Sequence, residues 1–223
     1  TSIEYQTFDT FYITPPRGNI FDDNNEPLAI STMEPHLFLN LRKVNSDNIQ
    51  IYKQYIKYNF EDFDQEDIDL IFQNRNSIQL IGNLNNFSTL ERQKLLELDA
   101  FKIYDFPLRK YNYDNLTSHI IGYVGKPTSD DFSLFSHTKQ TQQVGKNGLE
   151  RYYENTLTGI PGEVLFKGSE IIKYTPPLKG EDIFLSLNIQ TQQLVKDSLL
   201  QGIQLANENE NTQIKVTRSA SIV

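Results

Sequence analysis

The sequence predicts an α+β fold in which a small, mostly helical lobe is inserted between segments rich in short strands. Apolar residues recur with helical spacing between residues 46 and 98. Most of the remaining chain consists of short alternating stretches separated by proline, glycine and asparagine. The composition fits a folded protein, because 38% of the residues are hydrophobic and 12% are aromatic.

Length and charge narrow the classes of function. The 223 residues suffice for one domain or two unequal lobes. The chain carries 29 acidic and 21 basic residues, a net charge of −8, which disfavours a broad nucleic-acid-binding face. No apolar run reaches the roughly 18 residues of a membrane span, and the polar start lacks the basic region of a signal peptide. Because the chain has no cysteine, disulfides and thiolate sites are excluded, and the redox compartment stays open.

The first predicted element is a hairpin at residues 11–31. Two apolar stretches flank the turn Asp22-Asp23-Asn24-Asn25, whose residue types tolerate turn geometry. Pro15 and Pro16 lack backbone donors, so the first strand is expected to start after them or to lie on a sheet edge.

The lobe is expected to hold three helices. The first runs from Ser46, a candidate cap, to about Tyr58, and the second starts at Asp64. The third covers residues 88–98 and begins with a capping box, Ser88-Thr89-Leu90-Glu91. A short strand is predicted at 77–81. Three aromatic side chains of this lobe either dock a partner or form its own core: Tyr52, Tyr55 and Phe63.

After the lobe, alternation predicts a strand over 101–113, interrupted at Pro107. A short helix is expected at 116–123, ended by Gly122 or Gly125. The polar segment 127–144 is expected to be a loop.

The last third is expected to hold two helices and three strands. A helix at 148–157 is stopped by Gly159 to Gly162, and a strand pair follows at 163–167 and 170–175. A linker at 176–180 then leads to a strand at 182–187. The final helix, 189–206, is capped by Asn188, and four apolar side chains are expected to face inward: Leu194, Val195, Leu199 and Ile203. Residues 219–223 start an apolar strand, so we expect the natural chain to continue.

The residue patterns for catalysis or metal binding are weak. The three histidines, at 36, 119 and 137, are isolated, so no metal site is predicted, and His119 is expected to be a hydrogen-bonded structural residue. The turn at 22–25 lacks the glycine and glutamate of a calcium loop, and the segment 145–148 lacks phosphate-loop spacing. Ser136 and Lys139 match Ser-x-x-Lys, but they lie in a polar segment without its companion motifs. We therefore predict no catalytic residue and no cofactor.

Four motifs in one order resemble the N-terminal part of class B penicillin-binding proteins. Residues 15–29, Pro-Pro-Arg-Gly-Asn-Ile-Phe-Asp-Asp-Asn-Asn-Glu-Pro-Leu-Ala, are similar to the family signature Arg-Gly-x-Ile-x-Asp-Arg-Asn-Gly-x-x-Leu-Ala. His119 to Gly125 resembles the segment after the Arg-x-Tyr-Pro motif, and Gly145 to Glu150 resembles Gly-x-x-Gly-Leu-Glu. Residues 180–190 are similar to the start of the transpeptidase domain.

The chain also departs from the family pattern. Asp23 and Asn25 replace the usual arginine and glycine of the turn, and Arg109 to Asp114 lacks the proline and glycine of the second motif. Because asparagine is the next-best residue to glycine at positive φ, these changes bear on local turn geometry rather than on family membership. Residues 42–100 carry no family motif, and the family has a variable helical head there.

The resemblance implies an elongated pedestal, also called the dimerisation domain, between a membrane anchor and a D,D-transpeptidase that crosslinks peptidoglycan. It implies a pedestal at 1–41 and 101–180, an inserted helical head at 42–100 and the start of a transpeptidase domain at 181–223, with the reactive serine beyond Val223. The implied location is the periplasmic face of the inner membrane. The implied partners are the chain's own transpeptidase domain, a polymerising glycosyltransferase and a shape-determining scaffold, as in an elongation-type enzyme.

The motif residues are expected to be structural rather than catalytic: Arg17, Gly18, Asp22, Arg109, Gly145, Gly148 and Glu150. We hypothesise that Arg17 and Glu150 form a partly buried ion pair that joins the hairpin to the helix at 148–157. The alternative is two exposed, independent charges. Gly18, Gly145 and Gly148 are expected to serve turns and close packing.

Two other functions stay open at this point. The first is an extracytoplasmic binding module unrelated to penicillin-binding proteins. The second is a serine acyltransferase that uses Ser136 and Lys139.

Overall fold

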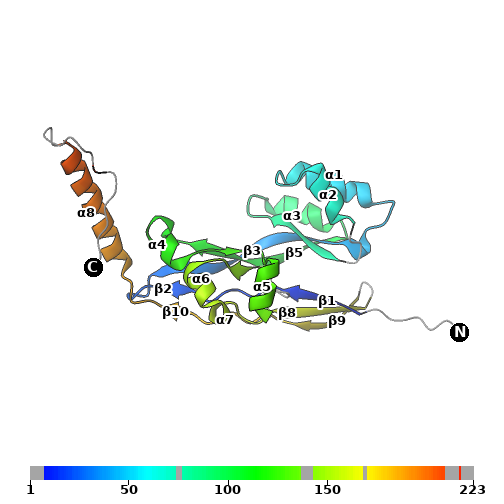
Figure 1. Cartoon of the computed structure of the whole chain (residues 1–223). Coiled ribbons are helices and arrows are strands. Elements are labelled where there is room, and N and C mark those ends of the chain that lie inside the picture. Colours follow the sequence, from blue (N-terminus) through cyan, green and yellow to red (C-terminus); the bar gives the residue numbers. More distant parts are fainter. Residues whose placement is uncertain (1–7, 74–76, 137–142, 168–169, 209–215, 217–223) are drawn as a thin grey trace.

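The computed structural model describes residues 8–73, 77–136, 143–167, 170–208 and 216. The molecule is elongated (Figure 1). A long sheet lies along its middle, a helical lobe sits over one end, and a single helix projects from the other. The fold is α+β, as the sequence predicts.

The central sheet is organised around one long strand, β3 (Pro27–Asn40). The strand β5 (Phe101–Tyr111) runs antiparallel to it, from Ala29 opposite Tyr111 to Leu39 opposite Phe101. On its other side β3 pairs with β2 (Ile20–Phe21) near its start and with β4 (Ile78–Asn83) near its end. β10 (Ile183–Phe184) lies parallel to β2.

The helical lobe covers the far end of β3 and β5. It contains the 3₁₀ turn η1 (Leu41–Lys43) and the helices α1 (Ile49–Asn59), α2 (Gln65–Ile71) and α3 (Thr89–Leu96). The last two begin with the expected capping residues, Asp64 and Ser88, each in a full capping box. α1 begins three residues later than predicted, after Asn48 rather than after a Ser46 cap, since the asparagines at 45 and 48 bond to each other's backbone instead.

The aromatic residues of the lobe lie in or against its own core. Tyr52 is buried, and Tyr55 and Phe63 pack against the same cluster. Tyr52 and Tyr55 both contact the Phe101 ring, with centroids 5.1 and 5.5 Å away. These side chains are therefore core residues, and β3 contributes Leu37 and Leu39 to the same cluster.

A second, three-stranded sheet lies beneath the first. Its order is β1 (Phe8–Ile13), β8 (Gly162–Lys167) and β9 (Glu170–Thr175), all antiparallel. Residues 11–13, expected in the hairpin, belong instead to β1 and pair with β8. The first strand of the hairpin is β2, which starts after Pro15 and Pro16 as expected. The predicted strand pair at 163–175 is confirmed.

In the described part of the chain, six short elements lie between β5 and β8. They are α4 (Asp114–Ile121), β6 (Val124–Gly125), α5 (Ser129–Leu134), β7 (Val144–Gly145), α6 (Gly148–Tyr152) and α7 (Glu154–Leu157). A second apolar cluster lies here, and β3 supplies Leu28 and Ala29 to it. The two apolar cores thus share one strand.

The last helix, α8 (Ile189–Glu208), leaves the body of the molecule (Figure 1). Asn188 caps it as predicted, its side-chain oxygen accepting from Thr191 N at 2.8 Å. The prediction that Leu194 faces inward is wrong: this side chain is 67% exposed, because beyond Ile189 the helix has little of the described chain to pack on. Residues 219–223 lie outside the described residues.

Three other expectations need correction. β5 continues through Pro107, because among the described strands it pairs only with β3, so its other edge can accommodate a residue without an N–H. The expected loop at 127–144 contains α5, which begins with a capping box between Thr128 and Asp131. The expected helix at 148–157 is two short helices separated at Tyr153, whose φ and ψ of −99° and 27° are not helical.

Strand lengths also differ from the predictions. β3 runs nine residues past the expected end of the hairpin, since β5 pairs with it along most of its length. β10 covers only two of the six residues predicted, because β2 itself is two residues long.

Candidate functional site: a buried network of charges

Arg17 lies on the extended segment between β1 and β2. Two backbone hydrogen bonds hold this segment in place, from Gly180 N to Pro16 O at 3.0 Å and from Gly18 N to Leu157 O at 2.8 Å. The Arg17 side chain is only 2% exposed. It therefore has to find its partners inside the protein.

Glu150 and Glu154 supply those partners. Arg17 Nε donates to Glu150 Oε2 at 3.0 Å, and Arg17 Nη2 donates to Glu154 Oε2 at 2.8 Å and to the Glu150 carbonyl at 3.1 Å. Both carboxylates are fully buried. The predicted ion pair between Arg17 and Glu150 is present, and the alternative of two exposed charges is wrong.

Arg109 joins the same carboxylate from β5. Its Nε donates to Glu150 Oε1 at 2.7 Å, while its Nη1 donates to the Gly18 carbonyl at 2.7 Å. Tyr111, two residues further along the strand and so on the same face, donates its hydroxyl to Glu150 Oε1 at 3.4 Å. One carboxylate thus joins three chain segments.

The sequence did not identify Glu154, nor Arg109 as a partner of Glu150. The available signals were spacing: Glu154 lies four residues after Glu150, and Arg109 and Tyr111 alternate on one strand face. Neither spacing specifies a partner, because the contacts join residues 41 to 137 positions apart.

The charges in this network balance: two guanidinium groups face two carboxylates. Burial alone would lower the pKa of Arg17, but the hydrogen bond that Arg17 donates to Glu154 and the charges of both carboxylates raise it above its ordinary value. Burial, reinforced by the Glu150 charge, raises the pKa of Tyr111 far above its usual range. The arginine stays charged and the tyrosine stays neutral, so this arrangement fixes geometry and offers no activated nucleophile.

The three motif glycines lie where a side chain would collide with backbone. A Cβ on Gly18 would come within 1.8 Å of Glu181 O, and one on Gly145 within 2.2 Å of Glu150 O. Gly148 has φ +58°, and its Cβ would also meet Ile120 O at 2.5 Å. Gly145 N donates to Glu154 Oε2 at 2.8 Å, so the first residue of the third motif is bonded to the carboxylate of the helix that follows the motif.

A third buried carboxylate, that of Asp131, adjoins this network. Asp131 accepts from Lys146 Nζ at 2.6 Å and from Arg151 Nη1 at 3.0 Å, and Arg151 also donates to Gly145 O. The Lys146 ammonium, the Thr128 backbone N–H and Arg151 hold the pKa of Asp131 far below its usual range, against the opposing effect of burial.

Asp22 occupies the turn between β2 and β3. It is 1% exposed, and its two oxygens accept three backbone N–H groups. Burial raises its pKa, but the hydrogen bonds from Ile189, Glu26 and Asn24 together leave it below the ordinary value. Asn25 in the same turn has φ 64°, as expected of an asparagine in the place of glycine.

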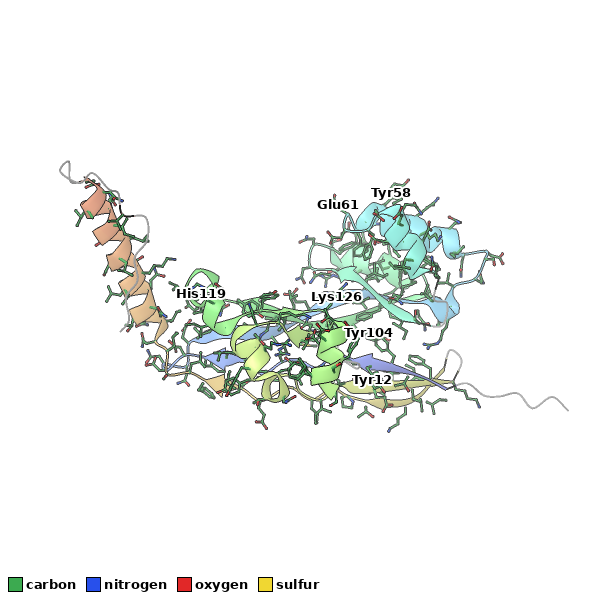
Figure 2. All side chains as sticks on the ribbon, viewed as in Figure 1. Tyr12, Tyr58, Glu61, Tyr104, His119 and Lys126 are labelled. Atoms are coloured by element: carbon green, nitrogen blue, oxygen red, sulfur yellow. The ribbon has the colours of Figure 1, made fainter. Side chains whose placement is uncertain are left out.

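The residues considered for chemistry are dispersed. His119 is exposed on α4 (Figure 2), so the expected structural role is wrong, because Ile121 rather than His119 faces the core there. Ser136 is exposed, and Lys139 lies outside the described residues. Within the described part of the chain, no group of three or more potential metal ligands comes together. None of the helices found there is long and apolar enough to cross a bilayer.

The arrangement of these motifs matches a known family. A family model described as "Penicillin-binding Protein dimerisation domain" matches residues 12–185. The chain belongs to this family. The region matched by the dimerisation domain includes the whole charge network and the helical lobe.

Relatives and solved structures agree. The chain is 30% identical to the peptidoglycan D,D-transpeptidase MrdA of Escherichia coli K12 over 213 residues, which is 87% of this chain and 33% of that protein. It is 24% identical to penicillin-binding protein 3 of Bacillus subtilis, over 87% of this chain and 30% of that protein. The chain thus spans about a third of the length of these relatives.

Its fold also resembles the penicillin-binding protein PBP2 of Helicobacter pylori in a complex with MreC. The TM-score is 0.67 and the identity 23%, over 88% of this chain and 39% of that one. Sequence and fold together identify a pedestal, or dimerisation, domain of a class B penicillin-binding protein. A binding module unrelated to this family is thereby excluded.

Proposed function

We propose that this chain is the non-catalytic pedestal that positions the D,D-transpeptidase domain of a class B penicillin-binding protein for peptidoglycan crosslinking. The observation that carries the proposal is the Glu150 carboxylate, which binds Arg17 and Arg109 from two other chain segments in the interior. A buried pair of this kind fixes orientation more than it adds net stability. Fixed orientation is what a positioning domain requires.

The proposed layout follows the sequence expectation. Residues 1–41 and 101–180 form the pedestal, 42–100 an inserted head lobe, and 181–223 the start of a transpeptidase domain. The lobe has an apolar cluster of its own, to which β3 and β5 also contribute, and this supports the first boundary. The departure of α8 from the body comes a few residues after the second, because β10 still pairs with β2.

The proposed partners are the chain's own transpeptidase domain, a polymerising glycosyltransferase and a shape-determining scaffold. The PBP2 in a solved complex with MreC supports the last of these. The proposed location is the periplasmic face of the inner membrane, where peptidoglycan is crosslinked.

The first experiment exposes two purified proteins to a labelled penicillin and measures intact mass. The 223-residue chain is expected to stay unmodified, while the full-length protein that contains it gains one adduct. A covalent adduct at Ser136 of the short chain would instead establish the serine acyltransferase alternative.

A second experiment tests positioning in the full-length protein. Glu150→Gln places an amide donor against a guanidinium donor, so the segments lose their fixed orientation. Crosslink formation on newly polymerised glycan is expected to fall roughly tenfold or more, while penicillin acylation changes little. Asp99→Asn, at an exposed ion pair of the lobe, is the control and keeps both activities. Unchanged crosslinking in a folded Glu150→Gln protein would contradict the positioning role.

A further inference from the structure

The first residue of α8 is held by a carboxylate far away in sequence. Asp22 Oδ2 accepts from Ile189 N at 3.1 Å. Its Oδ1 accepts from Asn24 N and Glu26 N, both at 2.8 Å, so the same side chain also shapes its own turn. With three backbone donors on two oxygens, Asp22 connects the β2–β3 turn rigidly to the start of α8.

The chain leading into α8 is bonded along the hairpin up to this point. Ile183 N donates to Asn19 O and Leu185 N to Phe21 O, each at 2.9 Å, and Asp23 N donates to Leu187 O at 3.0 Å. The Asp22 bond to Ile189 is the last of this series and the one that reaches the helix itself. Position and direction of the helix start are therefore both set from the hairpin.

Little else in the described chain constrains α8. Ile189 is its one buried residue, packed in the core between β2, β3 and α7. Further along, Leu194, Leu200 and Leu205 are 67%, 55% and 70% exposed. Within the described chain, α8 is held mainly at its first turn and by a small contact with α4, so it takes its direction largely from the bonds made at that turn.

We propose that Asp22 is a positioning residue that sets the direction of α8 and, through it, of the transpeptidase domain. The second half of this statement rests on the proposed function; the first half does not. The two halves therefore need separate measurements.

The test uses the full-length protein and the variant Asp22→Asn. An amide has one oxygen, so at least one of the three N–H groups then faces an NH₂ donor. Losing a buried acceptor is expected to lower the ratio of molecules with α8 bonded to the β2–β3 turn to molecules with α8 released by roughly tenfold. Asp23→Asn is the matched control: it removes a neighbouring charge of the same turn, but its amide oxygen can still accept from Asn188 Nδ2, a bond of 2.9 Å here.

The direct readout is a pair of spin-label distance distributions. Because this chain has no cysteine, paired cysteines can be introduced freely into a background whose other cysteines have been replaced. The pair Asp130 and Gln201 reports on α8 against the body, and Tyr58 and Asp130 on the lobe against the body. Asp22→Asn is expected to broaden the first distribution about twofold or more and to leave the second unchanged. If the substitution instead loosened the whole fold, both distance distributions would broaden.

A second variant removes the other partner of the bond. Ile189→Pro lacks the N–H that Asp22 accepts, and proline is well tolerated at the first position of a helix. Its control, Ile189→Val, keeps the N–H and a similar side chain. The proline variant is expected to broaden the α8 distribution and the valine variant to preserve it. An unbroadened distribution in either Asp22→Asn or Ile189→Pro overturns the inference.

Crosslinking and penicillin acylation of the same variants separate the two proposals. Asp22→Asn is expected to lower crosslinking with acylation preserved. A broadened α8 with unchanged crosslinking would refute the positioning function and leave the role of Asp22 at α8 intact. An unbroadened α8 refutes the role of Asp22 whatever the crosslinking does.

Discussion

At the scale of single residues, the central feature is that one carboxylate serves two arginines. Arg17 and Arg109 approach opposite oxygens of Glu150, and Glu154 accepts from Nη2 of Arg17. Contributions in such a network are not additive, because removing one member leaves the others buried without a partner. Glu150 has the most partners and is the position where a substitution has the largest effect.

The first prediction concerns stability of the purified chain. Glu150→Gln is expected to lower the free energy of unfolding by about 3–5 kcal/mol, the usual cost of breaking a buried pair. Urea denaturation followed by circular dichroism measures it. Asp99→Asn, whose carboxylate meets Lys43 at the surface, should leave the midpoint unchanged. Equal effects of the two substitutions would show that the buried network does not contribute as described.

Sequence reasoning found one contact of this network and missed the rest. Arg17 and Glu150 could be paired because both lie in ordered family motifs and carry opposite charges. Glu154 lies in the segment that continues the third motif and Arg109 is itself a motif residue, but neither was assigned a role in this network, and Tyr111 was assigned none. Their roles depend on how β5 and the two short helices approach each other, which is a property of packing and not of local pattern.

At the scale of elements, local signals predicted well where they act locally. The capping box at Ser88, the helix start at Asp64, the pair β8 and β9, and the cap of α8 at Asn188 were all expected and are present. The predictions failed where contacts with residues distant in sequence determine the local structure. Pro107 suggested a break in β5, yet the strand continues because its ladder is on one side only. The polar composition around Asp131 suggested a loop, yet ion pairs hold α5 there.

The second prediction concerns the pH dependence of α5. Asp131 has a folded-state pKa well below the unfolded value of about 3.9. Its stabilising contribution is therefore complete above that value and is lost as the pH falls through the folded pKa. Unfolding free energy should fall as the pH drops below about 4, and this fall should be shallower in Asp131→Asn.

Urea midpoints measured across this acidic range test the prediction. Asp130→Asn, on the exposed side of the same helix, is the control and should keep the steeper dependence. The wild-type slope will not vanish in Asp131→Asn, because the pKa of Asp22 and of Glu34 is also lowered. Parallel curves for the wild type and Asp131→Asn would contradict the assignment.

At the scale of the whole molecule, two apolar cores share the strand β3. Leu28 and Ala29 belong to one, and Leu37 and Leu39 to the other. If the lobe at 42–100 is a separate unit, as we propose, it should unfold locally while the segments joined by the charge network stay folded.

The third prediction tests this division by amide hydrogen exchange. Ile56 is fully buried in the lobe, and Ile56→Ala should destabilise it by about 2–5 kcal/mol. Exchange should accelerate at least about tenfold within 49–96, and that of residues 148–157 should not change. Leu90→Ala, at a 61% exposed position of the lobe, is the control and should alter neither. Equal acceleration in both regions would show one cooperative unit instead.

The continuity of β3 also fixes a length. Its eleven paired positions with β5 alternate between two faces, so a one-residue insertion in both strands would turn every inward side chain outward. Only insertions of two residues preserve the alternation, and each adds about 7 Å. The separation between the lobe and the turn that holds α8 can therefore change during evolution only in steps of about that size, so β3 acts as a ruler between the two ends of the molecule.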